Sequence, residues 1–218
     1  MLAAHYDTKI TPEGFIGATD SAAPCAMMLH LAKVMDTLLP APDLVPELTL
    51  TFIFFDGEEA FRSWSSTDSL YGSRHLASQW TSDYSVTGGE ICQDGAATHL
   101  DRIDTFLLLD LLGTSGPSFK RYTEFNTTLY DFAARVEVAV QGLETGDLVF
   151  TGVDTGWMVQ DDQVPFYQLG VTRILHLISS PFPSVWHTLQ DNEQALHYPT
   201  IDYLNKILRV FVYGYLNT

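Results

Sequence analysis

The sequence has few basic residues and no long apolar run, and both shortages narrow the classes of protein that it can encode. Its 218 residues include 27 Asp and Glu but only 11 Lys and Arg, a formal net charge of −16 at pH 7. The absence of a basic patch that could neutralise phosphates argues against nucleic acids and anionic membranes as partners. No apolar run approaches the roughly 18 residues that a membrane helix needs. Metal cations and peptides with a free amine are the partners that this charge favours.

Cysteine is also scarce. Cys25 and Cys92 are the only two, and they admit either one disulfide bridge or two small buried thiols. The first residues, MLAAHYD, are not the basic and then apolar pattern of a secretory signal. They resemble the interior of a buried strand, so we expect the natural protein to extend further toward its N-terminus. Asn126-Thr127-Thr128 is a glycosylation sequon, a weak indication of the secretory pathway.

The pattern of apolar residues predicts strands that alternate with helices. Apolar residues make up 46% of the chain and charged residues 17%, which is a globular composition. We expect buried strands at the start of the chain and at 48–55, 105–112 and 172–178, and helices at about 20–39, 73–80, 127–141 and 199–216. The segments 81–101, 113–126 and 142–163 are expected to be irregular. One domain, 1–218, with an α/β sandwich fold follows from this alternation.

The stretch 48–64, LTLTFIFFDGEEAFRSW, is the most informative part of the chain. Its first eight residues are almost wholly apolar or β-branched, as in a strand buried on both faces. Glu58 and Glu59 follow the end of the apolar run at Asp56-Gly57. Because α/β proteins place ligands beyond the carboxyl ends of such strands, one glutamate could bind a metal while the other serves as a base. The alternative is a pair of solvated glutamates at the start of a helix.

Other polar residues follow the predicted strands or open the first helix: His5, Asp7, Asp20, Asp110 and His187. Carboxylates and imidazole are ordinary zinc ligands, and a catalytic zinc keeps three protein ligands. Asp20, Glu59 and His187 would supply such a set from three loops, although any acidic α/β protein offers carboxylates in loops and no HExxH motif is present.

Asp110 interrupts the apolar run TFLLLDLL. An ionised carboxylate buried there would cost several kcal/mol unless it is paired, protonated or near a metal. An aspartate at the exposed tip of the strand is the alternative. Four aromatic side chains fall near the same loops: Trp64, Trp157, Phe182 and Trp186. Trp186, which directly precedes His187 in a Pro-rich loop, suits a pocket wall.

Long collinear segments of the chain resemble the animal glutaminyl-peptide cyclotransferases. They include HYD at 5–7, GATDSAAPCAMM at 17–28, FFDGEEAF at 54–61, DSLYGSRHLA at 68–77, LLDLLG at 108–113, QDDQVPF at 160–166, SSPFPSVWHT at 179–188, DNEQAL at 191–196 and TIDYLNKILRVFVYGYL at 200–216. The segments 81–101 and 114–150 resemble the family poorly. The resemblance implies a zinc-exopeptidase-like three-layer α/β sandwich with a central, mostly parallel (mixed) sheet, which lacks here the family's N-terminal edge.

The resemblance also implies an activity and a site. The family converts N-terminal glutamine of peptides and proteins, and more slowly glutamate, into pyroglutamate, with release of ammonia from glutamine. Carried over to this chain, Asp20, Glu59 and His187 would bind one Zn²⁺ and Glu58 would be the general base and acid. The other residues carried over are a hydrogen-bonded acidic pair, Asp110 and Asp161, and the pocket walls Trp64, Gln160, Phe182 and Trp186. A monomer in the secretory pathway, secreted or Golgi-retained, is expected.

A two-zinc aminopeptidase that hydrolyses N-terminal peptide bonds is the competing interpretation, because His5 and Asp110 match the ligands of a second zinc in related enzymes. A homologue without catalytic activity is a third, which the complete ligand set disfavours. Two substitutions depart from the family. Ala4 replaces a cysteine that bridges to the position of Cys25, and Gln163 replaces a histidine beside the acidic pair.

Overall fold

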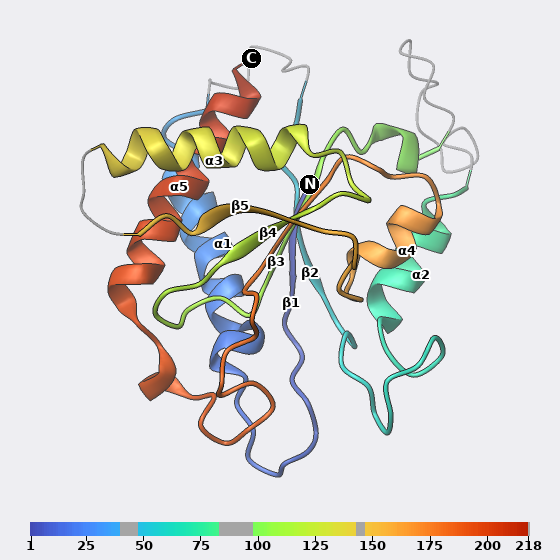
Figure 1. Cartoon of the computed structure of the whole chain (residues 1–218). Coiled ribbons are helices and arrows are strands. Elements are labelled where there is room, and N and C mark those ends of the chain that lie inside the picture. Colours follow the sequence, from blue (N-terminus) through green and yellow to red (C-terminus); the bar gives the residue numbers. More distant parts are fainter. Residues whose placement is uncertain (40–47, 83–97, 143–146, 218) are drawn as a thin grey trace.

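The computed structural model describes residues 1–39, 48–82, 98–142 and 147–217. At its centre lies a sheet in the order β2 (Phe52–Phe55), β1 (Leu2–His5), β3 (Phe106–Asp110) and β6 (Ile174–Ile178). Each neighbouring pair of these strands is parallel, so their carboxyl ends meet at one edge (Figure 1). A second sheet pairs β4 (Phe119–Tyr122) with β5 (Phe150–Thr155), also in parallel.

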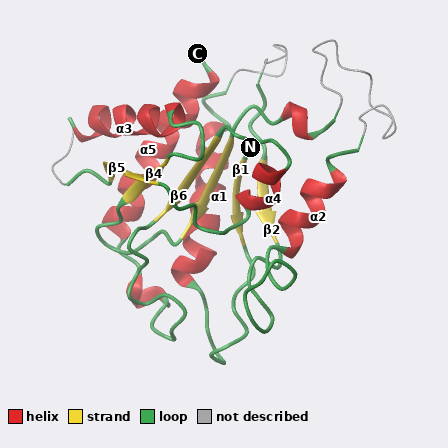
Figure 2. Cartoon of the chain, turned by 45° about the vertical axis from the view of Figure 1, so that its right-hand side comes forward, coloured by secondary structure: helices red, strands yellow, loops and turns green. Residues whose placement is uncertain are grey.

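Two layers of helices enclose the central sheet. Successive residues of a strand point to opposite faces. On one face, Leu107 and Leu109 pack against helices α1 (Ala23–Met35), α3 (Thr128–Gln141) and α5 (Tyr198–Leu216). On the other, Phe106 and Leu108 pack against α2 (Tyr71–Gln79) and α4 (Gln163–Gln168). Figure 2 shows the sheet between the two groups of helices, and the predicted three-layer α/β sandwich is confirmed. The sheet is parallel rather than mixed among the described residues.

The long helices follow the predicted patterns. In α1, Pro24 lies in the first turn, where its missing N–H costs nothing, and the buried side chains are Ala23, Met27, Met28, Leu31 and Met35. In α5 they are Leu204, Ile207, Leu208, Phe211 and Val212, a spacing that forms one continuous apolar face. Helix α1 ends at Met35, four residues before its predicted end.

Strands β4 and β5 lie in segments that were expected to be irregular, and α4 begins at the end of the second of these segments, in residues for which no element was predicted. Strand β4 has four residues, FKRY, and β5 carries Gly152 and is mostly exposed, so neither has a strong apolar signal. Strand β5 is held instead by tertiary contacts, because the buried carboxylate of Glu137 accepts hydrogen bonds from the N–H groups of Val149 (2.6 Å) and Phe150 (3.0 Å). Most of the predicted insertion 81–101, with Cys92, lies outside the described residues.

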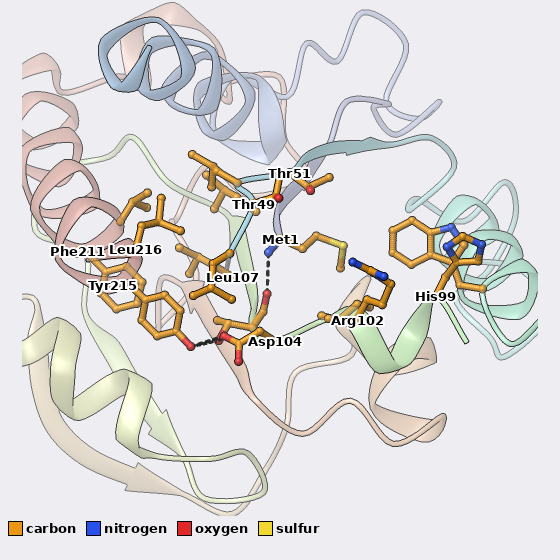
Figure 3. Close-up of a pocket in the computed structure, with 17 residues that line it drawn as sticks. Met1, Thr49, Thr51, His99, Arg102, Asp104, Leu107, Phe211, Tyr215 and Leu216 are labelled. Atoms are coloured by element: carbon orange, nitrogen blue, oxygen red, sulfur yellow. Dashed lines mark hydrogen bonds between the residues drawn. The ribbon is translucent and has the colours of Figure 1, made fainter. Parts of the chain in front are cut away.

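Two cavities lie at opposite ends of the central sheet. One, of about 370 Å³, lies at the amino ends of β1 and β3, between Met1, Leu107 and the end of α5 (Figure 3). The other, of about 350 Å³, lies at the carboxyl ends, where α/β proteins bind their ligands. Among the described residues, no helix is both long and apolar enough to span a bilayer.

Candidate active site

The cavity at the carboxyl ends of the strands brings together Asp20, Glu59 and His187. Asp20 comes from the helical turn Ala18–Ala22, Glu59 follows β2, and His187 follows β6. The Nε2 atom of His187 lies 3.1 Å from Oε1 of Glu59 and 3.3 Å from Oδ2 of Asp20. One ligand atom from each of the three residues lies within 4.8 Å of the other two. The structure therefore assembles the predicted metal-binding set from three distant segments.

Asp7 positions the two glutamates. The end of β1 lies beside the end of β2, and the carboxylate of Asp7 accepts hydrogen bonds from the backbone N–H groups of Glu58 (3.0 Å) and Glu59 (3.1 Å). Gly57 directly before them has a φ of +69°, in the left-handed region that favours glycine, and a Cβ atom at this position would meet Tyr71 at 3.1 Å. The backbone is thus held so that Glu59 reaches His187 while Glu58 lines the cavity.

The predicted pocket walls all line the cavity, which contains Lys9, Asp20, Glu58, Glu59, Trp64, Asp110, Leu111, Val159, Gln160, Ile178, Phe182, Trp186 and His187. The indole N–H of Trp64 donates a hydrogen bond to Oε1 of Gln160 (3.0 Å), which joins two loops across the cavity. Trp186 stacks on the imidazole of His187 with ring centroids 4.0 Å apart. Trp157, the other aromatic residue noted near these loops, is 86% exposed and does not line the cavity.

The electrostatics of the three predicted ligands suit a cation. Burial raises the pKa of Asp20, but His187 and His5 outweigh this effect and lower it to about 2. Burial lowers the pKa of His187, while its contacts with Asp20 and Glu59 raise it to about 9. Both carboxylates are more than nine-tenths buried, and within the described residues Oδ2 of Asp20 lies 3.3 Å from Nε2 of His187 without accepting a well-formed hydrogen bond. Two buried carboxylates beside an imidazole, with one oxygen unsatisfied, are a donor set that fits Zn²⁺.

Glu58 lies in an acidic neighbourhood. Burial, together with the charges of Asp161, Asp162 and Asp110, raises its pKa well above the usual value, although His5 opposes this. Burial and the charge of Asp161 also raise the pKa of Asp110, to about 6. A carboxyl group in such surroundings holds a proton at a pH where an exposed glutamate would not. Glu58 is therefore placed to exchange a proton with a group in the cavity.

Asp110 and Asp161 do not form the direct hydrogen bond that was expected of them. In the described part of the chain, Asp110 accepts hydrogen bonds from the Ser21 hydroxyl and from its neighbour Leu111 N–H (2.8 Å). The Oδ2 atom of Asp161 instead lies 2.8 Å from Nε2 of His176. The two carboxylates are coupled by charge, since Asp161 raises the pKa of Asp110, and each has its own partner.

Ser21 and His176 are members of the site that the sequence did not single out. Both are almost fully buried, at 1% and 2% exposure. Ser21 stands beside a candidate ligand in a segment that was interpreted as a helix cap. His176 stands inside the apolar strand ILHLI, and a lone polar residue within a buried strand was the available signal. The same signal identified Asp110.

A second group of possible metal ligands adjoins the first. Nε2 of His5 lies 3.2 Å from Oδ1 of Asp20 and 3.3 Å from Oδ1 of Asp110. Burial lowers the pKa of His5, but the close carboxylates of Asp110 and Asp20 raise it well above its usual value. The residues that an aminopeptidase would use for a second zinc are thus present and close together, with Asp20 shared by both groups.

The two departures from the family are accommodated locally. Ala4 is fully buried in β1, and the thiol of Cys25 donates a hydrogen bond to the His5 carbonyl at 3.1 Å. The amide of Gln163 donates to the Val159 carbonyl at 2.7 Å. The side chain of Gln163 is buried at the start of α4 and does not line the cavity, whereas Val159, to which it bonds, does.

The chain is similar to known proteins along almost its whole length. The model of peptidase family M28 matches residues 1–212. The glutaminyl-peptide cyclotransferase of Bos taurus is 46% identical over the whole chain, and the glutaminyl-peptide cyclotransferase-like protein of the same species is 42% identical over 99% of it. The chain spans 62% and 56% of the length of these two relatives.

Solved structures show the same relationship. The glutaminyl cyclase of Macrostomum lignano matches 99% of this chain with a TM-score of 0.85 and 34% identity, and the chain covers 67% of it. A leucine aminopeptidase precursor from Bacteroides thetaiotaomicron matches 98% of the chain with a TM-score of 0.70 and 20% identity, a likeness of fold; the chain covers 71% of that structure. The chain belongs to peptidase family M28 and, within it, to the glutaminyl-peptide cyclotransferase family.

Proposed function

We propose that this chain is the catalytic domain of a zinc-dependent glutaminyl-peptide cyclotransferase, which closes the N-terminal glutamine of a peptide into pyroglutamate and releases ammonia. N-terminal glutamate would react more slowly. The observation that carries the proposal is the position of Glu58, which lines the same cavity as the three-residue set Asp20, Glu59 and His187. Both hydrophobic clusters pack on one sheet, which supports a single domain over residues 1–218.

One Zn²⁺ would be held by Asp20, Glu59 and His187, whose oxygen and nitrogen atoms converge at the cavity. When bound, the ion supplies Lewis-acid polarisation of the γ-carbonyl of the substrate's glutamine. The chain's own residues supply proton transfer and orientation.

Glu58 is the proposed proton carrier. Its carboxylate takes a proton from the substrate's α-ammonium group, and the free amine then attacks the γ-carbon of the same residue. The bond to the γ-nitrogen breaks as Glu58 returns the first proton to that nitrogen, and the second proton of the ring nitrogen passes to the departing ammonia, which leaves as ammonium. The raised pKa of Glu58 brings its proton affinity closer to that of an α-amine, whose pKa is about 8. The acidic cavity also favours a cationic N-terminus.

The pocket walls supply proximity. Attack within one residue requires a curled glutamine side chain, and fixing that conformation removes a large entropic part of the barrier. Trp64, Phe182 and Trp186 offer apolar surface for the side chain, while Gln160 offers an amide that is already anchored to the Trp64 indole. The same walls limit access of water, which favours cyclisation over hydrolysis.

The test is product analysis by mass spectrometry. A peptide with N-terminal glutamine should lose one ammonia, and its N-terminus should become resistant to Edman degradation. The same peptide with N-terminal asparagine is the control, because its shorter side chain would form a strained four-membered ring. If the metal-loaded protein released no ammonia from the Gln-peptide, the proposal would be contradicted.

A two-zinc aminopeptidase is the second candidate, and the group His5, Asp20 and Asp110 favours it. The two functions differ in product and in metal content. Release of free leucine from a Leu-anilide, with two zinc ions per chain and an unchanged Gln-peptide, would establish the hydrolase. One zinc ion per chain with cyclisation and no leucine release would establish the cyclase.

We also propose a secretory-pathway location, a monomeric state and peptide or protein substrates, on the basis of family membership. The side chain of Asn126, in the sequon, is exposed at the start of α3. Expression in eukaryotic cells, followed by fractionation and enzymatic deglycosylation, tests the location and the use of the sequon together. Sedimentation of the purified chain tests the monomeric state.

A further inference from the structure

Asp68, a residue outside the cavity, organises the loop that carries Trp64. One carboxylate oxygen accepts hydrogen bonds from the Phe61 N–H and the Tyr71 hydroxyl, both at 2.8 Å. The other oxygen accepts from the N–H groups of Arg62 (3.0 Å) and Ser63 (2.9 Å). Three consecutive backbone N–H groups thus converge on one anion, an arrangement that fixes a loop because bonds to an ionised acceptor are roughly twice as strong as neutral ones.

The same loop is held from the other side. Asp68 N–H and the Ser65 carbonyl form a backbone hydrogen bond (3.2 Å), and the guanidinium of Arg74 donates to the Ser66 carbonyl (2.7 Å). The Phe61 and Tyr71 rings meet edge to face at 5.4 Å. Residues 61–69 therefore form a closed turn that is attached to the first turn of α2.

The position of Trp64 depends on this turn. Trp64 directly follows the last N–H group bound by Asp68, its side chain is 39% exposed, and the only hydrogen bond of its indole within the described residues goes to Gln160. A partly exposed tryptophan in a loop has few packing contacts to fix it. The hydrogen-bonded backbone before it must then supply much of its orientation.

We infer that Asp68 is a positioning residue that sets substrate affinity by holding Trp64 across the mouth of the cavity, without taking part in proton transfer. This inference rests on the proposed function. Asp68 does not line the cavity, and the backbone of Glu58 is held separately by Asp7 and by the Leu70 N–H, which donates to the Glu58 carbonyl at 2.9 Å. Loss of the Asp68 carboxylate should therefore affect binding more than catalysis.

The principal test is Asp68→Asn, whose amide nitrogen cannot accept the hydrogen bonds of Arg62 and Ser63. We expect KM for a Gln-peptide to rise about tenfold with kcat within about twofold of wild type. Tyr71→Phe removes one donor only and should raise KM about twofold to threefold, which provides a second variant that is less disruptive. A fall in kcat with unchanged KM, or no change in either constant, would overturn the inference.

A double-mutant cycle separates positioning from general loop structure. If Asp68 acts through Trp64, Asp68→Asn should raise KM no further in a Trp64→Ala background. An additional rise of the same size in that background would overturn the inference. Asp101→Asn is the matched control, because the Asp101 carboxylate, in the short 3-10 helix Leu100–Arg102 away from the cavity, also accepts a backbone N–H, from Thr98 at 2.8 Å. It should leave KM unchanged.

A spectroscopic readout decides the inference even if the proposed function fails. In a variant with Trp80, Trp157 and Trp186 replaced by phenylalanine, the fluorescence reports Trp64 alone. Asp68→Asn should then increase acrylamide quenching by about twofold, because the released indole becomes more exposed than its present 39%. Unchanged quenching overturns the inference. Absence of cyclisation by wild-type protein, with increased quenching in Asp68→Asn, refutes the proposed function and retains the positioning of Trp64 by Asp68.

Discussion

The carboxylate of Asp7 accepts a hydrogen bond from the backbone N–H of Glu58 at 3.0 Å, so the end of β1 fixes the residue that follows β2. The second oxygen does the same for Glu59 at 3.1 Å. One side chain thereby orients both the proposed proton carrier and a proposed zinc ligand. Four predictions follow from this and from other contacts.

Replacing Asp7 by alanine should impair catalysis and stability together. Two backbone N–H groups would lose an ionised acceptor, at a cost of about 1–3 kcal/mol each if they stay unsatisfied. We expect kcat/KM to fall at least tenfold and the urea midpoint to decrease. Asp56→Ala, a neighbouring carboxylate that does not line the cavity, is the control. Wild-type kinetics for Asp7→Ala would show that Asp7 does not position the glutamates.

Substitutions of Glu58 and of Glu59 should affect catalysis and metal binding differently. Glu58→Gln keeps the shape of the side chain but removes the proton acceptor, so turnover should fall by about 10²–10⁴-fold with zinc retained. Glu59→Ala removes a ligand, and zinc content should fall with activity. Metal analysis beside turnover checks both variants. Normal turnover by Glu58→Gln would show that another group carries the proton.

Asp68 should make stability depend on acid pH. Hydrogen bonds from the N–H of Ser63, then from Tyr71, Phe61 and Arg62, lower the pKa of Asp68 to about 2. Because the folded pKa lies below the ordinary value of 3.8, the stabilisation is present above pH 3.8 and is lost as the pH falls toward about 2.

Thermal unfolding between pH 5 and pH 2 measures this contribution. The Tm difference between wild type and Asp68→Asn should be largest near pH 5 and should shrink as the solution is acidified. Asp202→Asn, which removes a charge from the exposed side of α5, is the control. A Tm difference that is independent of pH would contradict the ionised state of Asp68.

Glu137 should contribute strongly to the stability of the fold, although it does not line the active-site cavity. This fully buried carboxylate of α3 accepts hydrogen bonds from Val149, Phe150 and the Tyr203 hydroxyl, and so connects α3 to β5 and α5. Glu137→Ala should lower the free energy of unfolding by about 3 kcal/mol or more, since it leaves buried N–H groups unsatisfied. Tyr203→Phe, which removes one bond, should cost only about 1 kcal/mol. Equal losses in the two variants would contradict this account.

Local sequence patterns identify most of the central layers. The apolar runs of β1, β2, β3 and β6 and the helical spacing in α1, α3 and α5 each carry their own signal, because these elements bury their side chains in the core. Strands β4 and β5 and helix α4 are short, and their stability comes from partners such as Glu137 that are distant in the chain. No local pattern predicts them.

The sequence by itself determined the strand-helix alternation, the polar residues at the strand ends and the family resemblance. The tertiary structure decided which of those residues meet. Only parallel pairing of four strands brings Asp20, Glu59 and His187 within 4.8 Å, since they are far apart in the chain. The tertiary structure also decided that Asp110 bonds to Ser21 and Asp161 to His176. Hydrogen-bond partners depend on side-chain directions, which sequence spacing does not specify.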